Sequence, residues 1–383
     1  MQKSQEESYK YDQNRRVLAE RYERIKLVLE LISGTVVPLL ACLFLLLTGA
    51  SQILSQSLMS MTDSYWAAVA AYVISFLLFL HVVELPFSFY SGFVVDHRFG
   101  LSRQLLRDWA SDAVKELGLE GVFGVILGLV LYYLIRATEL WWFAAAVLFA
   151  IFSIVLSIIL PYLIMPIFYR VTALSDTGLK ESLIAMVRKV GAKDIDRVLV
   201  ADESRRSIRA NAMFSGIGRS KAIVVFDTLV DKFTRRETVT VVAHELGHYV
   251  NKDVWKSALV SGFFAIPPFF IADRVLRFSR GVASSEIANP AGFPIIFGIF
   301  IAVSFVLQPL SNWISRRMES QADWFALEAA EDPDAQASAE RRLADMDLSV
   351  DRPKRLVELL FYTHPPSSKR IEMAEKWKQN HAS

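Results

Sequence analysis

Residues 31–50 have the sequence LISGTVVPLLACLFLLLTGA, which contains no charged side chain. A helix needs about 20 apolar residues to cross the hydrocarbon core of a bilayer. Further apolar segments lie at residues 66–90, 120–135, 141–165, 254–276 and 293–313. The sequence therefore predicts a mainly α-helical, polytopic transmembrane bundle of about six spans, four before residue 170 and two after residue 250.

The composition of the whole chain agrees with a membrane protein. Of its 383 residues, 53% are hydrophobic and 21% are charged, whereas soluble domains have about 45–50% and about 25%. The net charge of +2 provides no general attraction to nucleic acid, so we expect no nucleic-acid partner. The single cysteine, Cys42, excludes an intramolecular disulfide and a thiolate cluster, so a metal site would need His and carboxylate ligands.

The charges of the loops predict the orientation of the spans. The first 26 residues contain seven Lys or Arg, residues 51–65 contain none, and residues 94–119 contain four. Because cationic loops stay in the cytoplasm, we expect the N-terminus, residues 166–253 and the chain after residue 313 on the cytosolic side. The first apolar segment is too long for a cleavable signal peptide and is expected to be retained.

Residues 166–253 are more charged than the preceding spans and predict a small α+β unit. Residues 176–190 have helical spacing, and residues 197–201 alternate like a β-strand. Thr234 and Glu237 fit the S/T-x-x-E capping box, which predicts that a helix begins near Thr234.

Two further strands are expected in this unit. Residues 208–214 and 222–226 are rich in β-forming side chains and are separated by a segment with Gly216 and Gly218. This pattern predicts a β-hairpin.

The predicted helix after Thr234 contains the pattern H-E-x-x-H at His244-Glu245-Leu246-Gly247-His248. Positions four apart lie on one helix face, so both imidazoles can bind one Zn²⁺. Glu245 lies beside them and could act as the general base that takes a proton from the attacking water. The preceding residues 241–243 are apolar, and burying His and Glu among them is costly unless a partner such as a metal pairs with them.

A third ligand is expected from the end of the membrane hairpin. A catalytic zinc has three protein ligands and an open position. The fifth predicted span begins a few residues after His248 and the sixth ends shortly before Glu319, so Glu319 would return to the membrane surface that carries the motif. Asp323 lies four residues later on the same helix face, where it could orient a ligating imidazole. A solvated acidic face is the alternative for this pair.

These observations predict four regions and one Zn²⁺ per chain. An N-terminal membrane region with four spans covers residues 1–165, and the cytosolic α+β protease unit covers residues 166–253. A transmembrane hairpin covers residues 254–313, and residues 314–383 form the C-terminal part of the protease domain with the third zinc ligand.

The H-E-x-G-H motif, the membrane hairpin and the Glu319/Asp323 pair together resemble the integral-membrane gluzincins, in particular the type I CAAX prenyl endopeptidases and their bacterial relatives. Three further stretches are similar to the prenyl-protease branch: residues 97–104 with Asp112 and Lys115, the pair Asn211-Ala212, and His364-Pro365-Pro366 with Arg370-Ile371 behind it. The resemblance covers most of the chain after about residue 70.

The resemblance implies roles for residues that spacing alone does not assign. His364 and Arg370 would stabilise the oxyanion of the tetrahedral intermediate and shape the site. Asn211 and Ala212 would lie on an edge strand that pairs with an extended peptide substrate. The charge asymmetry and the resemblance together suit a homologue in a bacterial inner membrane.

Three functions remain open from the sequence. The first is a zinc endopeptidase that cuts peptides or proteins, including membrane-associated ones, at the membrane surface. The second is the same enzyme with a quality-control duty, the degradation of misfolded membrane proteins. The third is a membrane scaffold or transporter in which the metal is only structural, although such a site has no use for a general base. The oligomeric state is left open.

Overall fold

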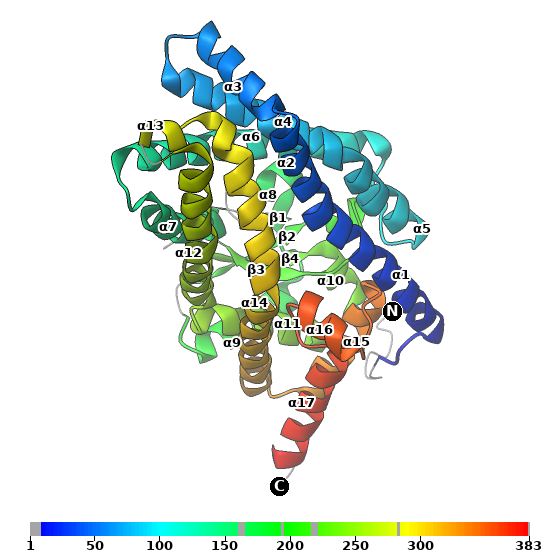
Figure 1. The fold of residues 1–383 in the computed structure, drawn as a ribbon. Helices are drawn as coiled ribbons and strands as arrows, with labels where there is room; N and C mark the ends of the chain where they lie inside the picture. Colours follow the sequence, from blue (N-terminus) through cyan, green and yellow to red (C-terminus); the bar gives the residue numbers. More distant parts are fainter. Residues whose placement is uncertain (1–8, 160–164, 193–194, 216–220, 282–283, 382–383) are drawn as a thin grey trace.

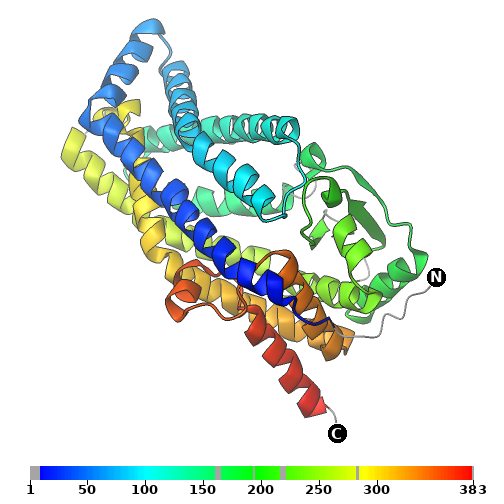
Figure 2. The ribbon, with the colours of Figure 1, turned by 90° about the vertical axis from the view of Figure 1, so that its right-hand side faces the viewer.

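A computed structural model describes residues 9–159, 165–192, 195–215, 221–281 and 284–381 of the chain. Long helices form a bundle, with a small sheet and α15 to α17 at one end and α3 with α13 at the other (Figures 1 and 2). This arrangement confirms the predicted fold class, a mainly α membrane bundle that carries a small α+β part.

Within the described residues, five helical segments are long and apolar enough to cross a membrane. They are Gln13–Leu47, Tyr65–Arg98, Leu106–Ala137, Asp253–Arg280 and Pro290–Ala330. The remaining predicted span, residues 141–165, begins as the shorter apolar helix α7, and its residues 160–164 lie outside the described part of the chain.

The membrane part of the chain before the sheet consists of helices joined by short connections. Their bounds are α1 (Gln13–Leu31), η1 (Ile32–Val36), α2 (Val37–Leu47), α3 (Ala50–Met61), α4 (Tyr65–Ser88), η2 (Phe89–Val95), α5 (Asp96–Arg98), α6 (Leu106–Ala137), α7 (Trp141–Ile159) and α8 (Met165–Phe168). The elements η1 and η2 are π-helical turns that join their neighbours without a break, so α1 and α2 form one continuous rod.

The sheet has four strands in the order β1-β2-β4-β3. Its strands are β1 (Val171–Ala173), β2 (Arg197–Ala201), β3 (Ala212–Ser215) and β4 (Ala222–Phe226). The strand at residues 197–201 is confirmed, and the predicted hairpin is present because β3 and β4 pair in antiparallel fashion. Its expected turn at Gly216 and Gly218 lies outside the described residues.

The first strand of the hairpin begins four residues later than predicted. Residues 207–208 instead contact the segment after α5: Ser207 bridges Ser102, and the Ile208 N–H donates to the Leu101 carbonyl at 3.1 Å. In this register residue 208 would face residue 229, but β4 ends at Phe226 and α10 begins at Asp227, so a longer first strand has no β4 partner. Consequently, β3 is a short edge strand.

Helices surround the sheet and continue to the C-terminus. Their bounds are α9 (Thr177–Lys189), η4 (Glu203–Arg205), α10 (Asp227–Lys232), α11 (Arg235–Val250), α12 (Asp253–Arg280), α13 (Ser284–Ile287), η6 (Pro290–Gly292), α14 (Phe293–Ala330), α15 (Pro333–Met346), α16 (Arg355–Phe361) and α17 (Ser367–His381). The predicted helix at residues 176–190 is confirmed as α9. The predicted capping box is confirmed too, because Thr234 and Glu237 exchange both hydrogen bonds at the start of α11.

A close contact between α11 and α14 sets the geometry of the region that carries the H-E-x-x-H motif. Gly247 is buried, and a Cβ atom built on it would lie 2.9 Å from the Cα atom and 3.1 Å from the carbonyl oxygen of Ala322. A backbone atom at that distance cannot rotate away, so only glycine permits this approach. The two helices therefore touch where one carries His244 and His248 and the other carries Glu319.

Gly247→Ala tests this contact against a matched substitution. An alanine would ordinarily stabilise a helix by about 0.5–1 kcal/mol relative to glycine, but here its methyl group must push α11 away from α14. We expect Gly247→Ala to lower the melting temperature in detergent, by the equivalent of about 1–3 kcal/mol of overpacking. Gly118→Ala on α6, where a new Cβ meets no atom within 4 Å, should leave it unchanged or raise it. Equal melting temperatures for the two variants would contradict this account.

Candidate metal centre and active site

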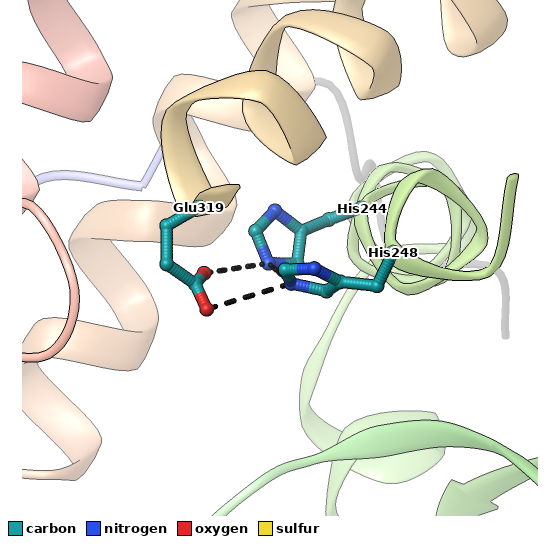
Figure 3. A group of neighbouring side chains, drawn as sticks. All are labelled: His244, His248 and Glu319. Carbon is teal, nitrogen blue, oxygen red and sulfur yellow. Dashed lines mark hydrogen bonds and ion pairs between the residues drawn. The ribbon is translucent and has the colours of Figure 1, made fainter. Parts of the chain in front are cut away.

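Three side chains from two helices that are far apart in the sequence converge where α11 contacts α14 (Figure 3). His244 and His248 project from one face of α11, and their Nε2 atoms lie 3.2 Å apart. The carboxylate of Glu319 on α14 faces both rings, at 3.2 Å from His244 Nε2 and 3.5 Å from His248 Nε2. The sequence predicted these three residues as the ligand set, and the structure brings one candidate ligand atom of each within 4.8 Å of the others.

The spacing of these atoms fits a small divalent metal. Ligands at 2.0–2.1 Å from a tetrahedral Zn²⁺ lie about 3.3–3.4 Å from one another, and the three distances here are 3.2, 3.2 and 3.5 Å. In addition, Glu319 Oε2 is buried, and among the described residues it faces His244 Nε2 but makes no further polar contact. A cation between these atoms would satisfy the carboxylate and both nitrogen lone pairs, so the residues present fit a metal of this kind.

A carboxylate lies behind each imidazole and fixes its orientation. His244 Nδ1 is 2.8 Å from Asp323 Oδ1, and His248 Nδ1 is 2.8 Å from Asp253 Oδ2. Such a hydrogen bond leaves Nε2 as the metal-binding atom and raises its basicity. Asp323 was predicted for this position, whereas Asp253 was not. Its only signal in the sequence is an acidic residue five positions after His248, at the start of the next helix.

These carboxylates also favour the protonated form of the imidazoles. Burial alone would lower the pKa of His244, but its hydrogen bonds with Asp323 and Glu319 outweigh burial and raise that pKa to about 10. For His248, burial is likewise outweighed, by the hydrogen bond with Glu319, and its pKa is raised. A metal that binds here must therefore displace protons from the histidines.

His244 and Glu245 line a cavity of about 470 Å³. The wall opposite α11 is formed by α15 and by the segments around Val350 and His364. Burial raises the pKa of Glu245 above its usual value, which brings a carboxylate closer to the pH at which a general base works best. A cavity of this size can hold several residues of a peptide.

Arg370 on α17 contacts the residues behind the histidines. Its Nε donates to Asp323 Oδ2 at 2.8 Å, its Nη2 donates to Asp323 Oδ1 at 2.5 Å, and its Nη1 pairs with Glu340 Oε2 at 2.8 Å. The buried Glu340 of α15 was not predicted, because no local pattern links it to residues on α14 and α17. Burial raises the pKa of Glu340 to about 7, although Arg370 limits the rise.

Of the three remaining predicted site residues, two line the cavity and one does not. His364 lies at the cavity wall, with its Nε2 atom 3.2 Å from Glu319 Oε1. Asn211 also lines the cavity, immediately before the edge strand β3. Ala212 is 2% exposed and packs in the core beneath the sheet, so it does not line the cavity.

Comparison with known families covers both halves of the chain. Residues 173–378 match Peptidase family M48, and residues 5–170 match the family described as CAAX prenyl protease N-terminal, five membrane helices. The boundary between the two matches falls at β1, the first strand of the sheet.

Individual relatives agree with these family matches. An uncharacterized metalloprotease of Bacillus subtilis, YhfN, is 29% identical over 94% of this chain and 85% of its own length. CAAX prenyl protease 1 of Saccharomyces cerevisiae is 29% identical over 76% of this chain and 68% of its own length. The crystal structure of Ste24p from S. mikatae superposes with a TM-score of 0.80 at 25% identity, over 94% of this chain and 88% of that chain. The chain therefore belongs to peptidase family M48 and is an integral-membrane metalloendopeptidase.

Proposed function

We propose that this enzyme hydrolyses peptide bonds at the cytosolic membrane surface with one Zn²⁺ per chain, held by His244, His248 and Glu319. The observation that supports this best is the position of Glu245, which lines the same cavity as His244, one of the three clustered ligands. A metal with a purely structural role would need no carboxylate base beside it. This argues against a non-catalytic scaffold or transporter.

The proposed mechanism assigns the proton transfers to the chain. When bound, Zn²⁺ would supply Lewis-acid activation of the attacking water and of the substrate carbonyl. Glu245 takes the proton of the attacking water and passes it to the leaving amine. His364 lies close enough to Glu319 to donate a hydrogen bond to the oxyanion as charge develops there.

We assign Arg370 a positioning role. The resemblance suggested oxyanion stabilisation by His364 and Arg370, but the Arg370 guanidinium is engaged with Asp323 and Glu340 on both sides. Arg370 therefore acts indirectly: it holds Asp323, and Asp323 in turn orients the His244 ring. Asn211 lines the cavity and Ala212 begins the edge strand β3, which supports the proposal that an extended peptide would bind there by strand addition.

The identity of the substrate has two candidates. The similarity to a relative named CAAX prenyl protease 1 supports a C-terminal CAAX-type peptide as the substrate. Because the enzyme itself is embedded in the membrane, unfolded segments of membrane proteins are the second candidate. Purified enzyme incubated with a farnesylated CAAX peptide and with casein, each with and without chelator, separates these two duties.

The first prediction concerns metal content. Purified protein should contain about one zinc per chain, measured by elemental analysis. Its zinc affinity should fall as pH is lowered from 8 to 6, because protons compete for His244 and His248. Zinc content that stays equal in a His244→Ala/His248→Ala double variant would remove the central claim.

Zinc affinity also tests the role of the two carboxylates that hold the imidazoles. Asp253→Asn and Asp323→Asn should each weaken zinc binding by about 10–100-fold. The exposed Asp334, which pairs with Lys378 far from the cluster, provides the control Asp334→Asn, which should bind zinc normally.

The second prediction distinguishes the general base Glu245 from the metal ligand Glu319 by the effect of replacing each with Gln. Glu245→Gln keeps the shape of the side chain and removes the base, so cleavage should fall by about 10²–10⁴-fold while zinc content stays level. Glu319→Gln should lose zinc and activity together, since it removes a charged ligand. Near wild-type proteolysis by Glu245→Gln would disprove this mechanism.

The third prediction concerns orientation, which we propose to be cytosolic for the N-terminus and the site, in a bacterial inner membrane. Cationic residues at the far end of α12 do not oppose it: Arg277 donates to the buried Asp273 at 2.9 Å and Arg280 donates to the Ala291 carbonyl at 2.7 Å. An impermeant maleimide should label an exposed Gln56→Cys in intact cells, but label an exposed Asp231→Cys only after lysis. Labelling of Asp231→Cys from outside would reverse the orientation.

A further inference from the structure

A carboxylate in the active-site cavity has no role in the mechanism above. Asp347 follows the last turn of α15 as its C-cap, and its side chain is among those that line the cavity with His244, Glu245 and Asn211. Its Oδ1 atom is buried and has no hydrogen-bond partner among the described residues. Asp347 is partly exposed, and a buried carboxylate oxygen without a partner costs free energy, so a contact made from the cavity side would be favourable.

The position of Asp347 at the C-terminus of α15 further destabilises its negative charge when no ligand is bound. The C-terminus of a helix carries partial negative charge, which repels a carboxylate and attracts a cation. Burial raises the pKa of Asp347 to about 6, while Arg209 and Arg15 limit that rise. The side chain is therefore mainly ionised at neutral pH.

Both neighbouring arginines are held by other acceptors. Arg209 donates from Nη2 to the Tyr22 hydroxyl at 2.9 Å and pairs with Asp96 at 3.5 Å. Arg15 donates from Nε to the Asp345 carbonyl at 2.6 Å and from Nη2 to the Met346 carbonyl at 3.4 Å. They stabilise the ionised form of Asp347 at a distance, but neither donates a hydrogen bond to its Oδ1 atom.

The next residue holds the backbone of Asp347 in place. Leu348 has a positive φ of 52°, which an L-residue adopts only when the surroundings enforce it. Its side chain is 1% exposed and belongs to a core cluster with Ala19, Tyr22 and Leu101. This anchor on the first helix fixes the chain at the end of α15, so Asp347 is presented to the cavity by a rigid wall.

We propose that Asp347 is a substrate-binding residue that pairs with a cationic side chain, Lys or Arg, of the peptide in the cavity. This inference rests on the proposed peptidase function and adds a preference for basic residues near the scissile bond. The pairing would supply the contact that the carboxylate lacks within the protein. A neutral backbone donor from the substrate is the competing partner, and it would produce no preference for charge.

The test uses full-length protein in nanodiscs and quenched fluorescent peptides that carry Lys, norleucine or Glu at each position around the cleavage site. At one position, wild type should prefer Lys over norleucine by about 10–100-fold in kcat/KM, the range of a hydrogen bond to a charged group. Asp347→Asn should reduce this ratio to near one through a loss of kcat/KM for the Lys peptide. Ser349→Ala, which alters an exposed residue lining the same cavity, should retain the preference.

Two further measurements keep the outcome decisive. The melting temperature of Asp347→Asn should equal or exceed that of wild type, because the variant removes an unpaired buried charge. A fall of several degrees would mean that Asp347 pairs within the protein, and this would overturn the proposal. So would equal kcat/KM for the Lys and norleucine peptides at every position.

Binding to full-length, zinc-loaded protein that carries Glu245→Gln distinguishes failure of this proposal from failure of the peptidase function. Fluorescence anisotropy should show tighter binding of the Lys peptide than of the norleucine peptide to Glu245→Gln, and no difference for the Glu245→Gln/Asp347→Asn double variant. If no peptide is cleaved, the peptidase function fails while this binding difference still decides the role of Asp347. If peptides are cleaved and bound without regard to charge, only the proposal for Asp347 fails.

Discussion

The contact between Gly247 on α11 and Ala322 on α14 is the constraint on which the rest of the site depends. At this distance the two helices can place His244 and His248 within 3.5 Å of Glu319, and a single added methyl group would separate them. The two helices are joined by α12 and by the first part of α14, a hairpin that passes along the bundle and back. The membrane hairpin thus brings Glu319, the third candidate ligand, next to the H-E-x-x-H motif. Neither α11 nor α14 forms the site alone.

The charges around this contact form layers in which each group has a partner. Glu319 faces the imidazole Nε2 atoms, Asp323 and Asp253 hold the Nδ1 atoms, and Arg370 with Glu340 lies behind Asp323. Burying these groups singly would be costly, whereas alternating signs at hydrogen-bonding distance offset much of that cost. The same pairing restrains the rings, so their orientation is set before any ligand binds. Asp347 stands outside this pattern, because its Oδ1 atom lines the cavity region without a hydrogen-bond partner among the described residues.

The first membrane helix contributes to the cavity as well as to the bundle. The buried Asp345 near the end of α15 accepts hydrogen bonds from the Tyr9 hydroxyl at 2.9 Å, the Asp12 N–H at 2.8 Å and Arg16 Nε at 2.7 Å. Through these bonds the N-terminal segment holds the wall that carries Asp347, more than 300 residues away in sequence. Because α1 continues into α2 without a break, a membrane span and a wall of the cavity form one rigid unit.

The sequence by itself determined the features that depend on local periodicity. Apolar length predicted the long helices, the Thr234/Glu237 pair predicted the start of α11, and the four-residue spacing put His244 and His248 on one helix face. Chain direction through the membrane hairpin was enough to bring Glu319 back to the same side. Only the tertiary structure decided which residues stand behind and opposite these groups. Asp253 has only a weak sequence signal and Glu340 and Asp347 have none, because the groups around each of them come from other helices. The late start of β3 and the engagement of Arg370 with Asp323 and Glu340 also depend on distant contacts, which local spacing cannot encode.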